Sequence, residues 1–180
     1  MVILGLDPGL ASLGWCLVHF RIGCQPRALD GGVIRTKADS RGSRADDLER
    51  RTRELVSQLR NRTHGCAFNI VAAEAMSWPQ HHQAKVMIAL AWGGIVALAE
   101  ERQAPVLQYT PKDVKREISG AASASKGDVQ AVVEAYVENA GRLLARLPKT
   151  QQNHLADALA VALTSRQSPL VKTAQRIAGG

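Results

Sequence analysis

The sequence predicts an α/β domain in which a mixed sheet carries helices on both faces. Three strand-like apolar runs follow one another at the start of the chain, and helices then alternate with shorter apolar runs. The size also fits, because 180 residues of which 46% are hydrophobic can bury a core without disulfides or a structural metal. We therefore expect one core.

Five apolar runs predict the strands. The first run stops at the turn signal Asp7-Pro8-Gly9, and the second follows at once, so these two strands should be neighbours. The fourth run, like the first, is followed directly by a carboxylate. The predicted strands are Val2 to Leu6, Leu13 to Phe20, Ala28 to Thr36, Phe68 to Ala73 and Val106 to Tyr109.

Apolar residues that recur every three to four positions predict the helices. They are expected at Ser40 to Arg62, Gln83 to Arg102, Pro111 to about Ser119, Lys126 to Ala140 and roughly Gln152 to Ser165. The longest uncharged stretch, Val86 to Ala99, is shorter than the roughly 20 residues of a bilayer span, so we expect a buried helix and no membrane role. Residues 1–166 should form one domain, and 167–180 a loosely ordered basic tail.

The charge balance favours a polyanionic partner. Twenty-three Lys and Arg residues against sixteen Asp and Glu residues give a formal charge of +7, as in nucleic-acid-binding proteins, although a basic solvated surface would look the same. Three cysteines without a CxxC spacing argue against disulfides and a zinc knuckle. The first residues lack a basic signal region and reach Asp7, so we expect a cytoplasmic protein.

Two carboxylates mark the ends of two predicted strands. Ligand sites in open α/β sheets form outside the carboxyl ends of the strands, where Asp7 and Glu74 both stand. If the strands are neighbours, the two anions repel each other unless they share a cation, which favours a divalent metal. The alternative is a turn-capping Asp7 and an unrelated surface Glu74.

The last helix adds two further candidates. His154 and Asp157 are three residues apart and therefore lie on one helical face, near the start of that helix. The residues that follow on this helix are small or apolar, so it should lie close against the sheet. An isolated Asp at a helix start is usually a dipole partner, but an adjacent His at ligand spacing favours a metal site.

Three stretches together resemble the RuvC Holliday-junction resolvases of bacteria. They are Ile3-Leu-Gly-Leu-Asp-Pro-Gly9, Ala73-Glu74 after an apolar strand, and His154-Leu-Ala-Asp-Ala-Leu-Ala160, in the order and spacing of that family. The resemblance implies a ribonuclease-H-like fold, a homodimer and a crossover junction endodeoxyribonuclease of recombination and DNA repair. It also implies a motor partner for branch migration, of the RuvA and RuvB type.

The resemblance assigns the site residues. It implies that Asp7, Glu74, His154 and Asp157 hold two divalent metal ions, Mg²⁺ or Mn²⁺. Some members have Asp at the position of His154, so the alternative is that His154 orients a water. Lys115 and Lys126 fall where the family keeps basic residues that face DNA. Family members often carry an aromatic residue where this chain has Ser77, so the next residue, Trp78, is a candidate for that DNA contact.

Other functions remain open at this point. The Asp-Pro-Gly turn also resembles the start of actin-like ATPases and sugar kinases, but those folds need two lobes, and 180 residues supply one. A nuclease that processes structured RNA and an inert junction-binding module are further alternatives. For the dimer, we expect the Gln83 to Arg102 helix at the interface, with close approach at Trp92 and Gly94, so that a charge at Ile95 would give monomers.

Overall fold

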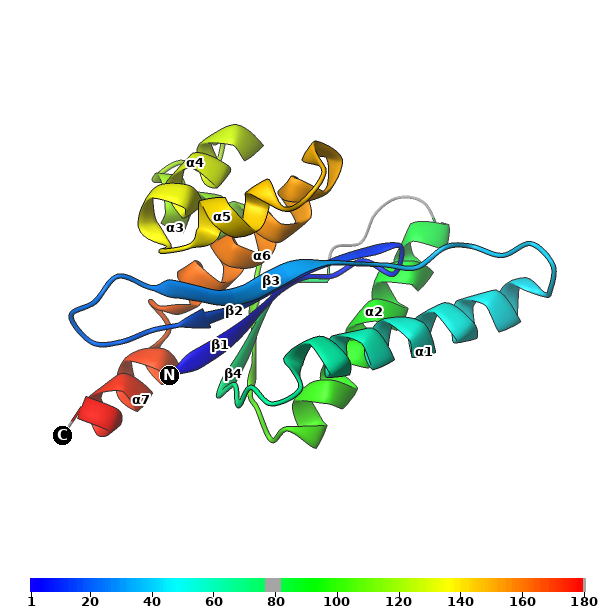
Figure 1. Cartoon of the computed structure of the whole chain (residues 1–180), viewed down its shortest axis with the longest axis horizontal. Helices are drawn as coiled ribbons and strands as arrows, with labels where there is room; N and C mark the ends of the chain where they lie inside the picture. Colours follow the sequence, from blue (N-terminus) through cyan, green and yellow to red (C-terminus); the bar gives the residue numbers. More distant parts are fainter. Residues whose placement is uncertain (77–81, 180) are drawn as a thin grey trace.

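The computed structural model describes residues 1–76 and 82–179, and a five-stranded mixed sheet lies at its centre (Figure 1). β1 pairs antiparallel with β2 and parallel with β4, so it is the middle strand. The strands are β1 (Val2–Asp7), β2 (Ser12–His19), β3 (Arg27–Arg35), β4 (Ile70–Glu74) and β5 (Val106–Tyr109), in the sheet order β3-β2-β1-β4-β5. The predicted α/β class and the five predicted strands are confirmed.

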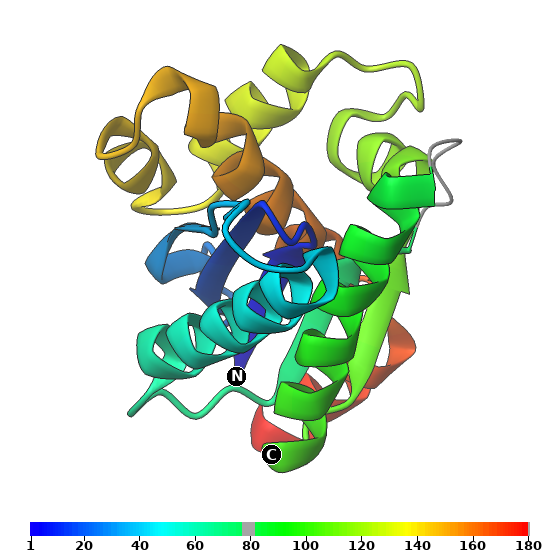
Figure 2. The same ribbon diagram turned by 90° about the vertical axis from the view of Figure 1, so that its right-hand side faces the viewer.

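Helices cover both faces of the sheet and form two separate apolar cores (Figures 1 and 2). α1 and α2 pack on one face, and α3 to α6 pack on the other. The helices are α1 (Arg44–Thr63), α2 (His82–Glu101), α3 (Pro111–Ser119), α4 (Lys126–Tyr136), α5 (Ala140–Ala145), α6 (Lys149–Ser165) and α7 (Pro169–Gly179).

α6 lies unusually close to the sheet because glycines face it. A Cβ on Gly14 would overlap the backbone carbonyl of His154, and one on Gly5 would overlap that of Ala158. The buried face of the helix is itself rich in alanine, including Ala158 and Ala162. Because the helix face is small and the sheet has no side chains at these points, α6 can place His154 and Asp157 at the carboxyl ends of β1 and β4.

α2 has one face in the core and a second apolar face in solvent. By length and composition alone α2 could cross a membrane, but Trp92, Ile95 and Leu98 are almost fully buried in the core that it shares with α1. Gly94 also faces inward, where a Cβ would come within 2.6 Å of Val56 Cγ2. The prediction that the subunits meet at Trp92, Gly94 and Ile95 is therefore wrong, because this face of α2 is buried against α1 in the same subunit.

Two helices were not predicted. The expected helix from Lys126 ends at Tyr136 because the chain turns at Val137 and Glu138 to bond the β2–β3 hairpin, and α5 then begins after Asn139, whose φ is 72°. The predicted loose tail is wrong, because residues 169–179 form α7. Ser168 caps its start by accepting a hydrogen bond from Val171 N, and the Val171 side chain is fully buried.

Candidate active site

Strand register places Asp7 and Glu74 together. β1 and β4 run parallel with Leu6 opposite Ala73, so the next residue of each strand lies at the same edge. Side chains alternate along a strand, and those of Ile3 and Ile70 pack in the core on the α6 face. Counting in twos from these residues puts both carboxylates on that face, at the carboxyl ends of the strands.

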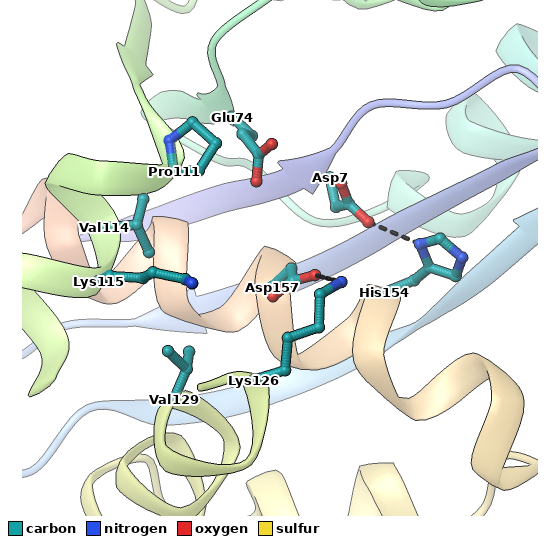
Figure 3. Close-up of a pocket in the computed structure, with 9 residues that line it drawn as sticks. All are labelled: Asp7, Glu74, Pro111, Val114, Lys115, Lys126, Val129, His154 and Asp157. Carbon is teal, nitrogen blue, oxygen red and sulfur yellow. Dashed lines mark hydrogen bonds and ion pairs between the residues drawn. The ribbon is translucent and has the colours of Figure 1, made fainter. Parts of the chain in front are cut away.

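α6 contributes the imidazole and the third carboxylate from its second and third turns, since His154 and Asp157 lie well inside Lys149–Ser165. His154 Nδ1 donates a hydrogen bond of 2.7 Å to Asp7 Oδ2. Because Nδ1 carries the hydrogen in this bond, Nε2 is the nitrogen with a free lone pair in the neutral ring. Asp157 lies one helical turn further along on the same side, and its carboxyl group faces those of Asp7 and Glu74 (Figure 3).

These side chains line a cavity of about 320 Å³ in which acidic and basic groups lie close together (Figure 3). Lys115 from α3 and Lys126 from α4 also reach into it, and the ammonium group of Lys126 meets Asp157. Its full lining is Asp7, Glu74, Pro111, Val114, Lys115, Lys126, Val129, His154 and Asp157. The structure thus gathers in one cavity six of the eight residues that the sequence singles out, while Ser77 and Trp78 lie outside the described residues.

The carboxyl groups in the cavity lie close enough that each makes ionisation of the others less favourable. Burial, followed by repulsion from the Asp7 and Asp157 carboxylates, raises the pKa of Glu74 from 4.5 to about 7. Burial also raises the pKa of Asp157, although Lys126 opposes this shift. The hydrogen bond to Asp7 raises the pKa of His154. A cation shared by these groups would relieve the repulsion, so the donor set fits a divalent metal that prefers carboxylate oxygens.

Three of the four candidate ligands are already paired within the protein. Asp7 accepts the hydrogen bond of His154, and Lys126 Nζ lies 3.3 Å from Asp157 Oδ2. Among residues 1–76 and 82–179, no group of three acidic, histidine or cysteine side chains already has the arrangement of a metal site. Metal ligation would therefore require local rearrangement of side chains, beginning with the Lys126–Asp157 pair, whereas His154 can keep its bond to Asp7 and bind through Nε2.

A buried arginine, which the sequence analysis missed, supports the turn after Asp7. Arg51 of α1 is 6% exposed, and its Nε donates to Thr36 Oγ1 at 2.9 Å. Thr36 in turn donates to the Leu10 carbonyl at 2.6 Å. This chain of bonds ties α1 to the β1–β2 turn that follows Asp7. No local sequence signal marks Arg51, because six other arginines lie on or beside the same helix.

The raised pKa of Glu74 predicts an unusual pH dependence of stability without metal. The unfolded chain releases this proton near pH 4.5, whereas the folded chain keeps it to about 7. The free energy of unfolding should therefore fall as the pH rises through this window and level off above it, with a total change on the order of 2 kcal/mol. Urea denaturation in EDTA at several pH values measures the change.

Glu74→Gln should remove most of this fall, because glutamine cannot ionise. Glu117→Gln is the matched control, because Glu117 is exposed and lies outside the cavity. If the pH profiles of wild type and Glu74→Gln coincide, the carboxylates do not disfavour one another as the burial and the geometry indicate.

Comparison with known proteins agrees with the geometry. The family model described as "Crossover junction endodeoxyribonuclease RuvC" matches residues 3–165. Proteins of that name from Natranaerobius thermophilus and Moorella thermoacetica are 30% and 35% identical to this chain. The alignments cover 96% and 91% of this chain and 99% and 89% of those proteins.

Solved structures show the same fold. The structure of Thermus thermophilus RuvC in complex with Holliday junction substrate superposes with a TM-score of 0.77 at 27% identity, covering 97% of each chain. The yeast mitochondrial Holliday junction resolvase Ydc2 superposes with a TM-score of 0.67 at 13% identity, covering 98% of this chain and 82% of that one, and this likeness concerns the fold alone.

Proposed function

This chain belongs to the RuvC family of crossover junction endodeoxyribonucleases, and on that premise we propose that it resolves four-way (Holliday) DNA junctions by paired symmetric nicks. The observation that carries the proposal is the convergence of Asp7, Glu74 and Asp157 with two lysines in one cavity. The function belongs to homologous recombination and DNA repair in the cytoplasm. We assign it to a nuclease domain of residues 1–166, against whose core α7 packs through Val171.

The side chains in the cavity suit phosphodiester hydrolysis. Asp7, Glu74, Asp157 and His154 would hold two divalent metal ions, Mg²⁺ or Mn²⁺, which together activate a water and stabilise the leaving 3′-oxygen. Asp7 orients His154 through the bond to Nδ1, which leaves Nε2 as the nitrogen that could hold a water or a cation. Lys115 and Lys126 offset the charge of the phosphate, and the side chains of Ser77 and Trp78 are further candidates for contact with DNA.

Cleavage of synthetic substrates tests the function. In Mg²⁺ or Mn²⁺ the protein should nick a four-way DNA junction at symmetric positions on two strands of like polarity, and leave linear duplex DNA of the same sequence uncut. EDTA should stop the reaction. Structured RNA is the informative competitor, because cutting RNA in preference to the junction would favour the RNA-processing alternative.

We further propose a homodimer through the outer face of α2, because two symmetric nicks require two sites. This face carries the exposed side chains of Val86 and Val96, which are 42% and 52% exposed, and between them the exposed Ala89 and Gly93. Small and apolar residues at this spacing allow two helices to approach closely. A branch-migration motor of the RuvA and RuvB type is the expected partner of this dimer.

A charge on this outer face should separate the subunits. Val96→Glu should give a folded monomer by light scattering, because two like charges would meet near the symmetry axis in a desolvated contact. Ala131→Glu adds the same charge on an exposed position of α4 and should leave the dimer intact. A dimeric, folded Val96→Glu protein would place the interface elsewhere.

A further inference from the structure

Lys126 has a position that the roles described so far do not explain. Its ammonium group lies 3.3 Å from Asp157 Oδ2, so it neutralises one of the carboxylates proposed to bind metal. The side chain of Lys126 is 65% exposed and that of Asp157 only 23% exposed. The lysine is therefore an external cation that reaches over the rim of the cavity to a partly buried anion.

The backbone of Lys126 is held firmly while its side chain is exposed. Lys126 is the first residue of α4, directly after the cap residue Ser125. Ser125 N donates to Asp128 Oδ2 at 2.9 Å, and Asp128 N donates back to Ser125 Oγ at 3.2 Å. This reciprocal capping fixes the Cα of Lys126, so a change of partner for its ammonium group requires only rotations within the side chain.

The ammonium group of Lys126 cannot keep its full ion pair with Asp157 when a divalent cation is bound to that carboxylate. Both are cations that seek one carboxylate, and their mutual repulsion disfavours simultaneous binding. A DNA phosphate entering the cavity offers the ammonium group another anion within reach. Lys115 lines the same cavity, but no ion pair joins it to a carboxylate in the part of the chain that the structure describes.

We propose that Lys126 exchanges partners between Asp157 and the DNA phosphate, and that this exchange makes metal binding and junction binding cooperative. Without DNA, the lysine competes with a divalent cation for Asp157 and weakens metal binding. With DNA bound, the lysine turns to the phosphate and Asp157 becomes available. Linkage requires the converse, so a bound cation strengthens junction binding by the same factor. This proposal rests on the proposed function, since it takes the metal and the DNA from it.

Calorimetric titration with Ca²⁺, with and without a saturating four-way junction, tests the exchange. The junction alone is titrated as background, and denaturing gels verify that it stays intact. In the free protein, the Ca²⁺ affinity of Lys126→Gln should be about two- to fivefold higher than that of Lys115→Gln, in line with the modest contribution of an exposed ion pair. With the junction bound, the difference between wild type and Lys126→Gln should disappear.

Two controls separate the possible causes. Lys115→Gln removes the same charge from the same cavity without breaking an ion pair, so it reports general electrostatics. Lys126→Arg keeps the cation and should keep the wild-type pattern. The exchange is overturned if both glutamine variants bind Ca²⁺ equally, or if the advantage of Lys126→Gln persists on the junction.

The proposed function fails in a different way. If Ca²⁺ binds equally to wild type and Asp7→Asn, and the wild type leaves junctions uncut in Mg²⁺ and Mn²⁺, the metal site itself is wrong and the exchange is wrong with it. If the wild type cleaves junctions and binds the ion but the variants show no difference between the free and the junction-bound states, the partner exchange alone is wrong.

Discussion

Asp7→Asn should abolish junction cleavage and leave junction binding intact. Asparagine keeps the shape of the side chain, and its carbonyl oxygen can still accept the hydrogen bond from His154 Nδ1. What is lost is one negative charge at the centre of the proposed metal site. Cleavage should fall by more than about a hundredfold, because even groups that only orient metal ligands contribute 10–100-fold.

Three measurements on the purified protein check this expectation: cleavage in Mg²⁺ and Mn²⁺, junction affinity in EDTA, and melting temperature with and without Mn²⁺. Affinity should hold or rise, because one anion fewer faces the phosphates. The stability that Mn²⁺ adds should shrink. Asp30→Asn on exposed β3 is the matched control. Retained cleavage by Asp7→Asn would overturn the site assignment.

Gly14→Ala should destabilise the protein strongly and disturb the site at the same time. The new Cβ would overlap the carbonyl group of His154, which is backbone and cannot rotate away. Either β2 or α6 must shift, so the free energy of unfolding should fall by about 2–3 kcal/mol or more. Because α6 carries His154 and Asp157, the remaining folded protein should also cleave more slowly per molecule.

Gly32→Ala is the matched control for this substitution. Gly32 pairs with Trp15 in the same sheet, and the nearest atom to its new Cβ would be Trp15 Nε1, at an ordinary contact distance of 3.5 Å. The free energies of unfolding of the two variants, measured by chemical denaturation, separate the cost of the clash with α6 from the cost of replacing a glycine in the sheet. Equal stability of the two variants would mean that α6 can move away from the sheet without loss.

The parts of the fold that depend on sequence periodicity were predictable. All five strands and the helix that carries His154 and Asp157 follow from apolar patterns and turn signals in the sequence. α7 was missed because only a narrow face of it is buried. The cap Ser168 and the first-turn Pro169 are signals that could have identified it. α5 is too short to show periodicity, and it depends on contacts with a distant hairpin.

The candidate site was predictable as a set of residues but not as a network. Strand-end carboxylates and helix spacing indicate which side chains meet, since both are local patterns. The pairing of His154 with Asp7 spans 147 positions, and that of Lys126 with Asp157 spans 31. Such pairs depend on how far apart the elements pack. The orientation of α2 also depends on packing, because the sequence of a helix that is apolar on several sides does not show which side is buried in the core of its own subunit.

The register of β1 and β4 has a consequence for how this enzyme can change over evolution. Asp7 and Glu74 share a face because each lies an even number of residues beyond a side chain that packs toward α6. Inserting or deleting one residue in either strand would turn that carboxylate to the α1 and α2 side of the sheet. A change of two residues would keep the face but move the carboxylate about 7 Å along the strand, so β1 and β4 are constrained in length as well as in parity.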